Sequence, residues 1–340
     1  MQWSEAHRVA MLAAAHAHRD LGIDTSRRID VFAAIEKSDI LLAFEPFPRL
    51  SGAYFSDPNV KAAILINANH PLSRQRYTAA HELGHHLLSH GTSVDPATEP
   101  LFRWGGTNPP DTEMVAEAFA AWFLMPPRLV QSCLSELGIV RPERPDEVYT
   151  LSLRLGTSYE ATARHLPNLQ LASGSAVDGW IRVQPRDIKT ALTLGMPVGD
   201  LRYDLWPLTY RDNDRHFVVQ PGDRLVVSLS EIPSSGFTWQ YDEPPLGCVF
   251  VADSFERQST VDMWNRAAPE NLLGEAEGAE VRRAFEFEVS LEAPEVSSTL
   301  SFRKEQPWDP DAVSDRYAIS LRIEPPRRGV PQDKLVLQVA

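Results

Sequence analysis

The sequence predicts an α+β protein, with a small sheet beside a helical bundle in its first half and an all-β second half. Residues 1–172 are rich in alanine and leucine at helical spacing, with short apolar runs among them. Residues 212–340 instead contain short alternating runs between many prolines, a pattern typical of strands. We therefore expect two domains, 1–172 and 212–340, joined by a connector over residues 173–211, which have no clear period.

The individual elements follow from capping residues and from the period of the apolar positions. Ser4 and Gly22 bracket a first helix, and a second helix is expected over Val31–Ser38. Three strands and two long helices are expected next: Ile40–Phe44, Leu50–Phe55, Ala62–Asn67, Arg74–His90 and Thr112–Leu124. Ser73 is the expected N-cap of the first long helix, and Gly91 its end. Strands are expected in the second half over Arg224–Ser230, Arg283–Ser290 and Tyr317–Ile323.

The composition excludes several classes of protein. The 340 residues include 33 Lys and Arg against 46 Asp and Glu, a formal net charge of −13. This surplus of acidic groups argues against binding nucleic-acid phosphates, which requires Lys and Arg. The two cysteines, Cys133 and Cys248, exclude a disulfide framework and a thiolate zinc site, and a reducing compartment is expected. Since no apolar run approaches the roughly 18–20 residues that span a bilayer, we expect a cytoplasmic protein that does not contact membranes.

The sharpest motif is His81-Glu82-Leu83-Gly84-His85, inside the helix expected over Arg74–His90. Residues four apart lie on one face of a helix, so both imidazoles can reach the same metal ion. Glu82 lies about 100° around the helix from His81, beside the metal, where it can hold a water molecule. The pattern is typical of zinc peptidases, in which zinc activates the water and the glutamate is the general acid and base. The alternative is a polar pair of histidines on an amphipathic helix, with a solvated Glu82.

A third protein ligand must complete such a site. Metzincins place a histidine six residues after the second ligand, but Gly91 stands at that position, so this class is excluded. Gluzincins take a glutamate from a second helix, and Glu113, in the first turn of the helix Thr112–Leu124, is the favoured candidate. Glu117, one turn later, is the competitor, and its expected role is an outer acceptor that orients a ligating histidine. The first half is thus predicted to be a gluzincin-like metallopeptidase domain.

Four other residues are candidates for secondary roles. His86 and His90 form a second pair four residues apart, but no glutamate follows His86, so exposed or capping histidines are expected. Full activity requires a group that stabilises the oxyanion of the tetrahedral intermediate. Tyr54 and His165 are candidates for this role, and the sequence does not rank them.

Two segments resemble a known family. RQRYTAAHELGHHLLSH (residues 74–90) and EMVAEAFAAWFLMPP (residues 113–127) resemble the ImmA/IrrE metallopeptidase family, with Tyr77 where phenylalanine is usual. The resemblance covers about residues 25–172 and implies that the metal ligands are His81, His85 and Glu113. It also implies that the substrate is a defined protein, usually a helix-turn-helix repressor encoded nearby. Residues 145–171 could pass for a helix-turn-helix themselves, but they hold few basic residues, so no direct contact with nucleic acid is expected.

The second half resembles chagasin-type cysteine-peptidase inhibitors, which are small immunoglobulin-like β-sandwiches with three loops at one end. The loop from Ile232 to Trp239 keeps the proline, glycine and tryptophan of the first loop motif, and Gln306 replaces the arginine of the third. Proline and glycine fix a loop's shape, Trp239 anchors it, and Trp308 offers a flat apolar contact. The candidate partner-binding residues are Pro233, Gly236, Trp239, Pro307 and Trp308, with Gly274 and Gly278 in the middle turn.

Together these features predict a zinc-dependent endopeptidase that cleaves a helix-turn-helix repressor and carries an immunoglobulin-like sandwich. The acidic composition suits a basic protein substrate. The alternative is a binding or inhibitor protein, whose sandwich captures a peptidase or another partner beside a vestigial or structural metal site. A third hypothesis is that the Pro307–Trp308 loop, or residues 91–111, cover the cleft and regulate it.

Overall fold

The computed structural model describes residues 1–96, 109–193, 199–255 and 281–330, and by its contacts the chain divides into two compact units. Unit 1 comprises Met1–Arg141, Leu151–Val177 and the described residues from Pro326 on, and unit 2 comprises Pro142–Thr150 and Asp178–Pro325. The chain therefore returns to unit 1 after unit 2, whereas the sequence suggested a single passage through a connector. Gly274, Gly278 and most of the segment 91–111 lie outside the described residues.

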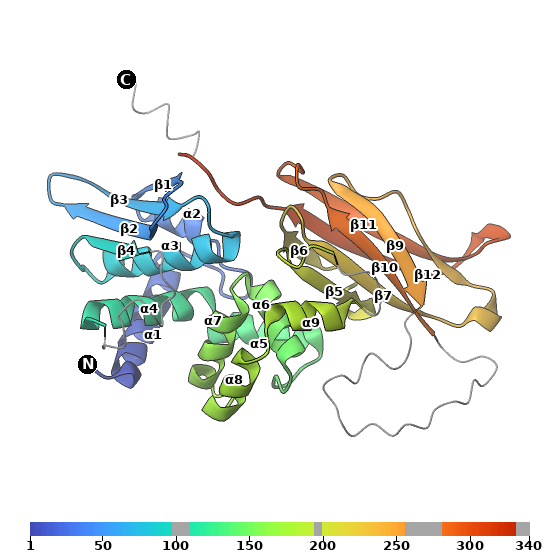
Figure 1. The fold of residues 1–340 in the computed structure, drawn as a ribbon, viewed down its shortest axis with the longest axis horizontal. Helices are drawn as coiled ribbons and strands as arrows, with labels where there is room; N and C mark the ends of the chain where they lie inside the picture. The colour runs from blue at the N-terminus through green and yellow to red at the C-terminus, as the bar shows by residue number, and fades with distance from the viewer. Residues whose placement is uncertain (97–108, 194–198, 256–280, 331–340) are drawn as a thin grey trace. The chain divides into compact units, whose positions relative to one another are not determined.

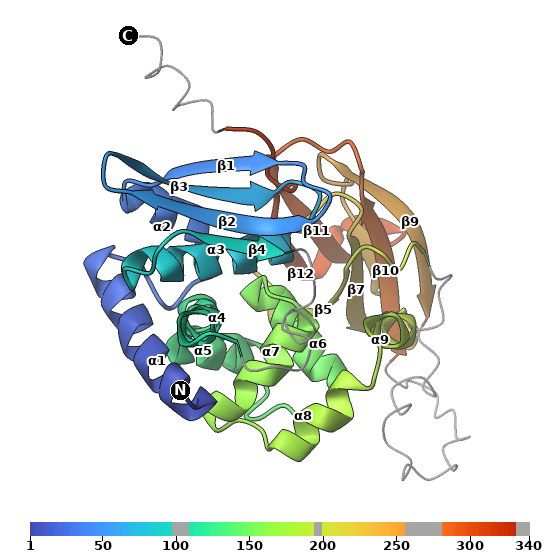
Figure 2. The same ribbon diagram turned by 60° about the vertical axis from the view of Figure 1, so that its left-hand side comes forward.

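Unit 1 combines a four-stranded sheet with helices, and α3 lies along one face of the sheet in both Figure 1 and Figure 2. Its elements are α1 (Trp3–Asp20), α2 (Val31–Lys37), β1 (Leu41–Glu45), β2 (Leu50–Asp57), β3 (Val60–Asn67), α3 (Leu72–Leu87), β4 (Ser93–Pro96), α4 (Asp111–Leu124), α5 (Pro127–Leu137), α7 (Tyr159–His165) and the 3-10 helix η1 (Leu166–Leu169). Helices α6 (Pro145–Leu155) and α8 (Gly174–Ile181) each span a boundary between the units.

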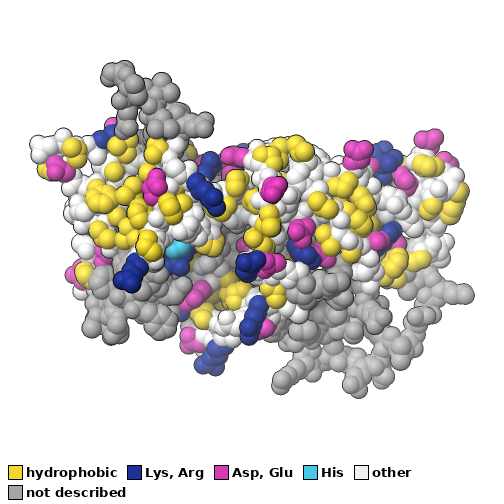
Figure 3. All heavy atoms as spheres, turned by 45° about the horizontal axis from the view of Figure 1, so that its top comes forward, with side chains coloured by type: hydrophobic (Ala, Val, Ile, Leu, Met, Phe, Trp, Pro, Cys, Tyr) yellow, Lys and Arg dark blue, Asp and Glu magenta, His cyan; other side chains and the backbone are white. Residues whose placement is uncertain are grey.

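The sheet of unit 1 has the order β1-β3-β2-β4, with β1 parallel to β3 and the other pairs antiparallel. Side chains alternate between the faces of a strand, so Phe44 of β1 and Ile66 of β3 share the buried face, which contacts α2 and α3. Phe55 of β2 lies on the opposite face and is 43% exposed. Figure 3 shows hydrophobic side chains gathered in patches on this side of the molecule.

The helices of unit 1 pack around α4. Ala6, Ala10 and Ala14 recur every fourth residue of α1, are buried, and give that helix a face of small residues that packs on α4. Helix α4 is buried along most of its length, as expected for a helix that is apolar nearly all round. Among the described residues, neither α4 nor any other helix is long and apolar enough to cross a membrane.

The helices that carry the predicted ligands begin after prolines. Helix α3 follows Pro71, with ψ of 152°, and its N-cap is therefore not the predicted Ser73. Helix α4 follows Pro110, with ψ of 150°. Proline suits this place because its φ is already fixed and because the N–H that it lacks has no partner within the first turn.

Helix α3 also ends earlier than predicted, at Leu87. Ser89 adopts a left-handed φ of 56° and closes the helix in a Schellman motif. In this motif the N–H of His90 donates to the carbonyl oxygen of His85 at 2.9 Å, and the N–H of Ser89 donates to that of His86 at 3.1 Å. The turn brings His90 back beside the last turn of α3.

Unit 2 contains two four-stranded sheets, with the strand orders β5-β7-β10-β9 and β6-β12-β11-β8. Its elements are α9 (Pro185–Leu192), β5 (Leu205–Thr209), β6 (His216–Val219), β7 (Arg224–Glu231), β8 (Thr238–Tyr241), β9 (Cys248–Phe255), β10 (Val281–Val289), β11 (Val296–Gln306), β12 (Asp309–Ile323) and two 3-10 turns, η2 (Tyr210–Asp212) and η3 (Pro233–Ser235). Aromatic rings join the two sheets: Tyr241 stacks on Phe250, with centroids 4.7 Å apart, and Phe285 meets Phe302 at 5.1 Å. The second half is therefore a β domain built on an aromatic core.

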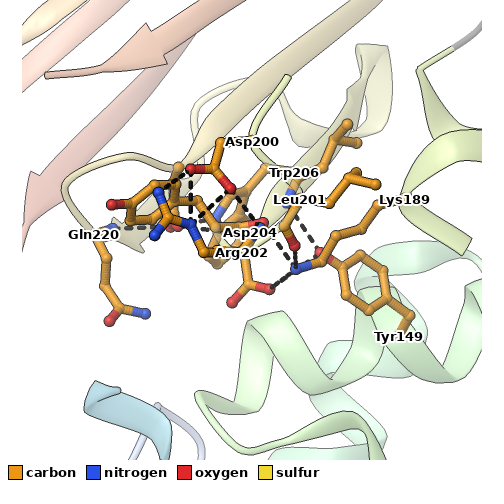
Figure 4. A network of polar contacts seen from close by, with 11 residues as sticks. Tyr149, Lys189, Asp200, Leu201, Arg202, Asp204, Trp206 and Gln220 are labelled. Atoms are coloured by element: carbon orange, nitrogen blue, oxygen red, sulfur yellow. Dashed lines mark hydrogen bonds and ion pairs between the residues drawn. The ribbon is translucent and has the colours of Figure 1, made fainter. Parts of the chain in front are cut away.

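A polar network ties part of α6 into unit 2 (Figure 4). Tyr149 of α6 donates to Asp204 Oδ1 at 3.3 Å and accepts the N–H of Leu205 at 2.9 Å. Lys189 of α9 lies 3.1 Å from the same Asp204 oxygen and donates to the carbonyl oxygen of Tyr203 at 2.8 Å. These contacts explain why Pro142–Thr150 belongs to unit 2.

Candidate metal centre

Two buried histidines of α3 meet on one face of the helix. Nε2 of His81 and Nε2 of His85 lie 3.1 Å apart, and the side chains are 3% and 1% exposed. The four-residue spacing places the rings one above the other on the helix. Because both rings direct a nitrogen at the same place, they can share a cation there.

Glu113, in the first turn of α4, completes a group of three. Its Oε2 lies 3.3 Å from His81 Nε2, and its Oε1 lies 3.4 Å from His85 Nε2. Gly84, between the two histidines, allows α4 to approach this closely, since a Cβ at that position would lie 2.9 Å from the ring of Phe119. The glycine inside the motif thus helps to bring the glutamate of the second helix to the histidines of the first.

The group of His81, His85 and Glu113 has the dimensions of a tetrahedral metal site. Zinc bonded to nitrogen and oxygen at roughly 2.0–2.1 Å holds its ligand atoms roughly 3.3–3.4 Å apart. Here the two Nε2 atoms are 3.1 Å apart, and they lie 3.3 and 3.4 Å from the two different oxygens of the Glu113 carboxylate. Burial alone would raise the pKa of Glu113, but hydrogen bonds from the two histidines outweigh it and hold the pKa below its ordinary value of 4.5. Two imidazoles and one charged carboxylate therefore fit a zinc ion.

Further side chains lie beside the Nδ1 atoms of the two histidines. Glu117, one turn after Glu113, places Oε2 3.5 Å from His81 Nδ1, and its Oε1 accepts a hydrogen bond from the Tyr77 hydroxyl at 3.0 Å. It therefore lies where an outer acceptor for His81 would lie. His90 Nδ1 lies 3.1 Å from His85 Nδ1, so the turn that ends α3 supplies a partner for the second histidine. The sequence suggested only an exposed or capping role for His90, because nothing in it signals the left-handed Ser89.

Glu82 is fully buried beside the histidines, and a residue of the sheet donates a hydrogen bond to it. The Ser93 hydroxyl, at the start of β4, donates to Glu82 Oε2 at 2.8 Å, and Glu82 is 0% exposed. Ser93 was not among the predicted residues, because its position depends on the pairing of β4 with β2, which the sequence does not reveal. The hydrogen bond fixes one carboxylate oxygen of Glu82.

The candidate partner-binding residues of unit 2 fall into two environments. Trp239 is 1% exposed, and its indole N–H donates to the carbonyl oxygen of Ser230 at 2.9 Å, so it belongs to the core. Trp308 is 71% exposed, and its ring lies over Gly236, where a Cβ would stand 2.6 Å from it. Pro233 begins the 3-10 turn that leads to Gly236. The loop with Pro233 and Gly236 and the turn with Pro307 and Trp308 therefore lie together at one end of unit 2.

One family model matches part of the sequence. Residues 35–166 match the family model Peptidase_M78, described as the IrrE N-terminal-like domain. Residues 35–166 are therefore similar to the IrrE N-terminal-like domain; most of them belong to unit 1, and Pro142–Thr150 belong to unit 2. All residues of the candidate metal centre, His81, Glu82, His85, Glu113 and Glu117, lie within this range.

Other comparisons concern curated proteins and solved structures. No curated protein matches the sequence. The chain is similar to the cysteine protease inhibitor EhICP2 from Entamoeba histolytica (15% identity, TM-score 0.26, covering 36% of this chain and 95% of that one). It is also similar to amebosin (13% identity, TM-score 0.26, covering 36% of this chain and 98% of that one). A further similar structure is PbICP-C, solved in complex with falcipain-2 (10% identity, TM-score 0.19, covering 36% of this chain and 90% of that one).

The two candidates for oxyanion stabilisation occupy different places in unit 1. Tyr54 of β2 is 3% exposed, and its hydroxyl is hydrogen-bonded to His86 Nδ1 at 3.0 Å. His165 is 2% exposed and donates from Nε2 to the carbonyl oxygen of Met125 at 3.2 Å. Met125 follows the last residue of α4, whereas Glu113 is in its first turn, which separates them by roughly 18 Å of helix. The described contacts of His165 therefore lie away from the ligands, whereas Tyr54 is held by the residue next to His85.

Glu117→Ala tests whether Glu117 orients His81 at the candidate metal centre. We expect the variant to bind zinc about 10–100-fold more weakly, because loss of an outer acceptor leaves His81 less well oriented and less basic. Competition titration against a chelating dye measures the affinity. Glu36→Ala, an exposed glutamate of α2, is the control and should leave it unchanged. Equal affinities of Glu117→Ala and the unaltered chain would contradict the role given to Glu117.

His165 makes the stability of unit 1 depend on pH. Burial, with a smaller contribution from His7, lowers the pKa of His165 from 6.5 to about 3, against an opposing hydrogen bond to Met125. Between pH 7 and pH 5 the unfolded chain therefore takes up a proton at this residue and the folded chain does not, so acidification lowers the free energy of unfolding by about 2 kcal/mol. In denaturant titrations at both pH values, His165→Gln should lose about 2 kcal/mol less on acidification than the unaltered chain. An identical loss in both would show that His165 is not the group responsible.

Proposed function

We propose that unit 1 is a gluzincin-like, zinc-dependent endopeptidase. The observation that supports this most strongly is the 3.1–3.4 Å spacing of the facing atoms of His81, His85 and Glu113 within the residues that match the Peptidase_M78 family model. Zinc bound there would lower the pKa of a bound water and polarise the carbonyl of the scissile bond.

Glu82 is the proposed general base and acid. It takes a proton from the attacking water and later delivers a proton to the leaving amine. The hydrogen bond from Ser93 to Oε2 fixes the direction of the carboxylate during both transfers. Burial of Glu82 keeps bulk water from competing for that proton.

We propose that the substrate is a protein, namely a helix-turn-helix repressor encoded near this gene. The resemblance to ImmA/IrrE peptidases supports this, and the net charge of −13 suits the approach of a basic, DNA-binding protein. The test is to incubate the zinc-loaded chain with the repressor from the neighbouring gene and to identify the products by mass spectrometry. We expect one defined cut that a chelator prevents and added zinc restores. An intact repressor under all zinc conditions would refute this substrate.

A second candidate function belongs to unit 2, which we propose to be an immunoglobulin-like sandwich that captures a partner protein. The exposed Trp308, seated over Gly236, favours this reading, because a large exposed aromatic ring is a typical anchor of a protein interface. Its two facing sheets and aromatic core support the fold assignment.

Trp308→Ala tests this second function, with a papain-type cysteine peptidase as the probe. If unit 2 captures such a peptidase, the full chain should inhibit it, and Trp308→Ala should weaken inhibition at least about tenfold. The free energy of unfolding should change by less than about 0.5 kcal/mol, because the side chain is exposed. No inhibition by the unaltered chain would exclude this class of partner.

A further inference from the structure

The outer edge of the sheet in unit 1 is paired with a segment that follows unit 2 in the chain. Strand β1 is the first in the order β1-β3-β2-β4, so one of its sides faces away from β3. On that side the N–H of Phe44 donates to the carbonyl oxygen of Gly329 at 2.9 Å, and the N–H of Gly329 donates to that of Phe44 at 2.7 Å. The segment thus covers backbone groups that an edge strand otherwise presents to other chains.

A buried glutamine holds the same segment two residues earlier. Gln75 of α3 is 0% exposed, its Oε1 accepts the N–H of Arg327 at 2.9 Å, and its Nε2 donates to the carbonyl oxygen of Arg327 at 3.1 Å. Its amide therefore offers the same donor and acceptor as a neighbouring strand. A buried amide is stable only when it is hydrogen-bonded, so Gln75 is suited to bind a peptide backbone.

The sequence of the segment fits this place. Pro325 and Pro326 favour an extended backbone. Gly329 adopts φ of 69°, a conformation that other residues rarely take. Arg328, between the two paired residues, is exposed. A peptide that fits is therefore extended, is bound through its backbone, and has glycine opposite Phe44.

We propose that β1 and Gln75 form a docking site for an extended peptide, and that its occupant is residues 326–329 of this same chain, added to the sheet as a short strand. The segment thereby attaches the part of the chain that follows unit 2 to the sheet of unit 1. Gln75 precedes His81 by six residues, roughly 9 Å along the helix, so the docking is independent of the proposed peptidase function.

Hydrogen exchange of the full chain tests this docking. In Gly329→Val the segment should leave β1, because valine is strained at positive φ. The backbone amides at positions 44 and 329 should then exchange at least about tenfold faster than in the unaltered chain. Arg328→Val introduces the same side chain at the exposed neighbouring position, and it should leave the exchange rates at positions 44 and 329 unchanged. If Phe44 exchanges at the same rate in all three chains, the proposal is wrong.

A second measurement uses the synthetic peptide EPPRRGV, residues 324–330, labelled with a fluorophore. It should bind the Gly329→Val chain, whose site is vacated, and restore slow exchange at Phe44. The unaltered chain should bind at least about tenfold less, because its tethered segment competes at high effective concentration. A peptide with valine in place of glycine is the control and should not bind. Equal binding of the two peptides, or no binding of either to a Gly329→Val chain whose free energy of unfolding is unchanged, would overturn the proposal.

Discussion

Glu82→Gln is expected to slow peptide-bond cleavage about 10²–10⁴-fold while zinc binding stays within about twofold. Glutamine has nearly the same shape and can still accept the hydrogen bond from Ser93, so the burial and packing of the site are preserved. It cannot take a proton from water, however, and that is the step assigned to Glu82. The measurement is kcat/KM on the cleaved repressor, together with the zinc content of the purified chain.

Glu36→Gln, an exposed residue of α2, is the matched control and should cleave as fast as the unaltered chain. If Glu82→Gln retains zinc and full activity, Glu82 is not the general base. If it loses zinc, the residue contributes to metal binding instead, and the division of roles between Glu82 and the three proposed ligands is wrong.

Glu113→Ala is expected to remove most of the stabilisation that zinc gives to the folded chain. For the unaltered protein, zinc at about 1,000 times its Kd should raise the free energy of unfolding by about 4 kcal/mol. With only the two histidines left, the same zinc concentration should add less than about 1 kcal/mol. Denaturant titrations with zinc and with a chelator measure both values.

The comparison with Glu117→Ala makes this test specific. Loss of an outer acceptor should reduce the zinc stabilisation by only about 1.4–2.7 kcal/mol, which corresponds to a 10–100-fold weaker affinity. Glu113→Ala must therefore lose more than Glu117→Ala, although both remove a carboxylate from the same helix. The opposite order would make Glu117 the ligand, which is the alternative that the sequence left open.

The local part of the candidate site could be predicted because helical spacing alone fixes it. His81 and His85 face the same way in any regular helix, and Glu82 must then lie beside them. The choice between Glu113 and Glu117 depends on how α4 is rotated against α3. In the observed rotation Gly84 lies against the ring of Phe119. This rotation places Glu113 against both Nε2 atoms and Glu117 against His81 Nδ1.

The parts that could not be predicted depend on contacts between distant residues or on local backbone. Ser93 reaches Glu82 only because β4 pairs with β2, and His90 reaches His85 only because Ser89 is left-handed. The pairing of Gln75 with Arg327 joins residues 252 positions apart, and nothing in either local sequence indicates it. Strand runs in the second half were recognisable from alternation, but their order in two sheets is a property of the folded chain.

X-ray absorption spectroscopy of the zinc-loaded chain shows whether His81, His85 and Glu113 bind the metal together. We expect one zinc ion per chain, with a first shell of nitrogen and oxygen at roughly 2.0–2.1 Å and the scattering of two imidazoles, of which one is lost in His85→Ala. A first shell without imidazole scattering, or one left unchanged by both His85→Ala and Glu113→Ala, would contradict this expectation.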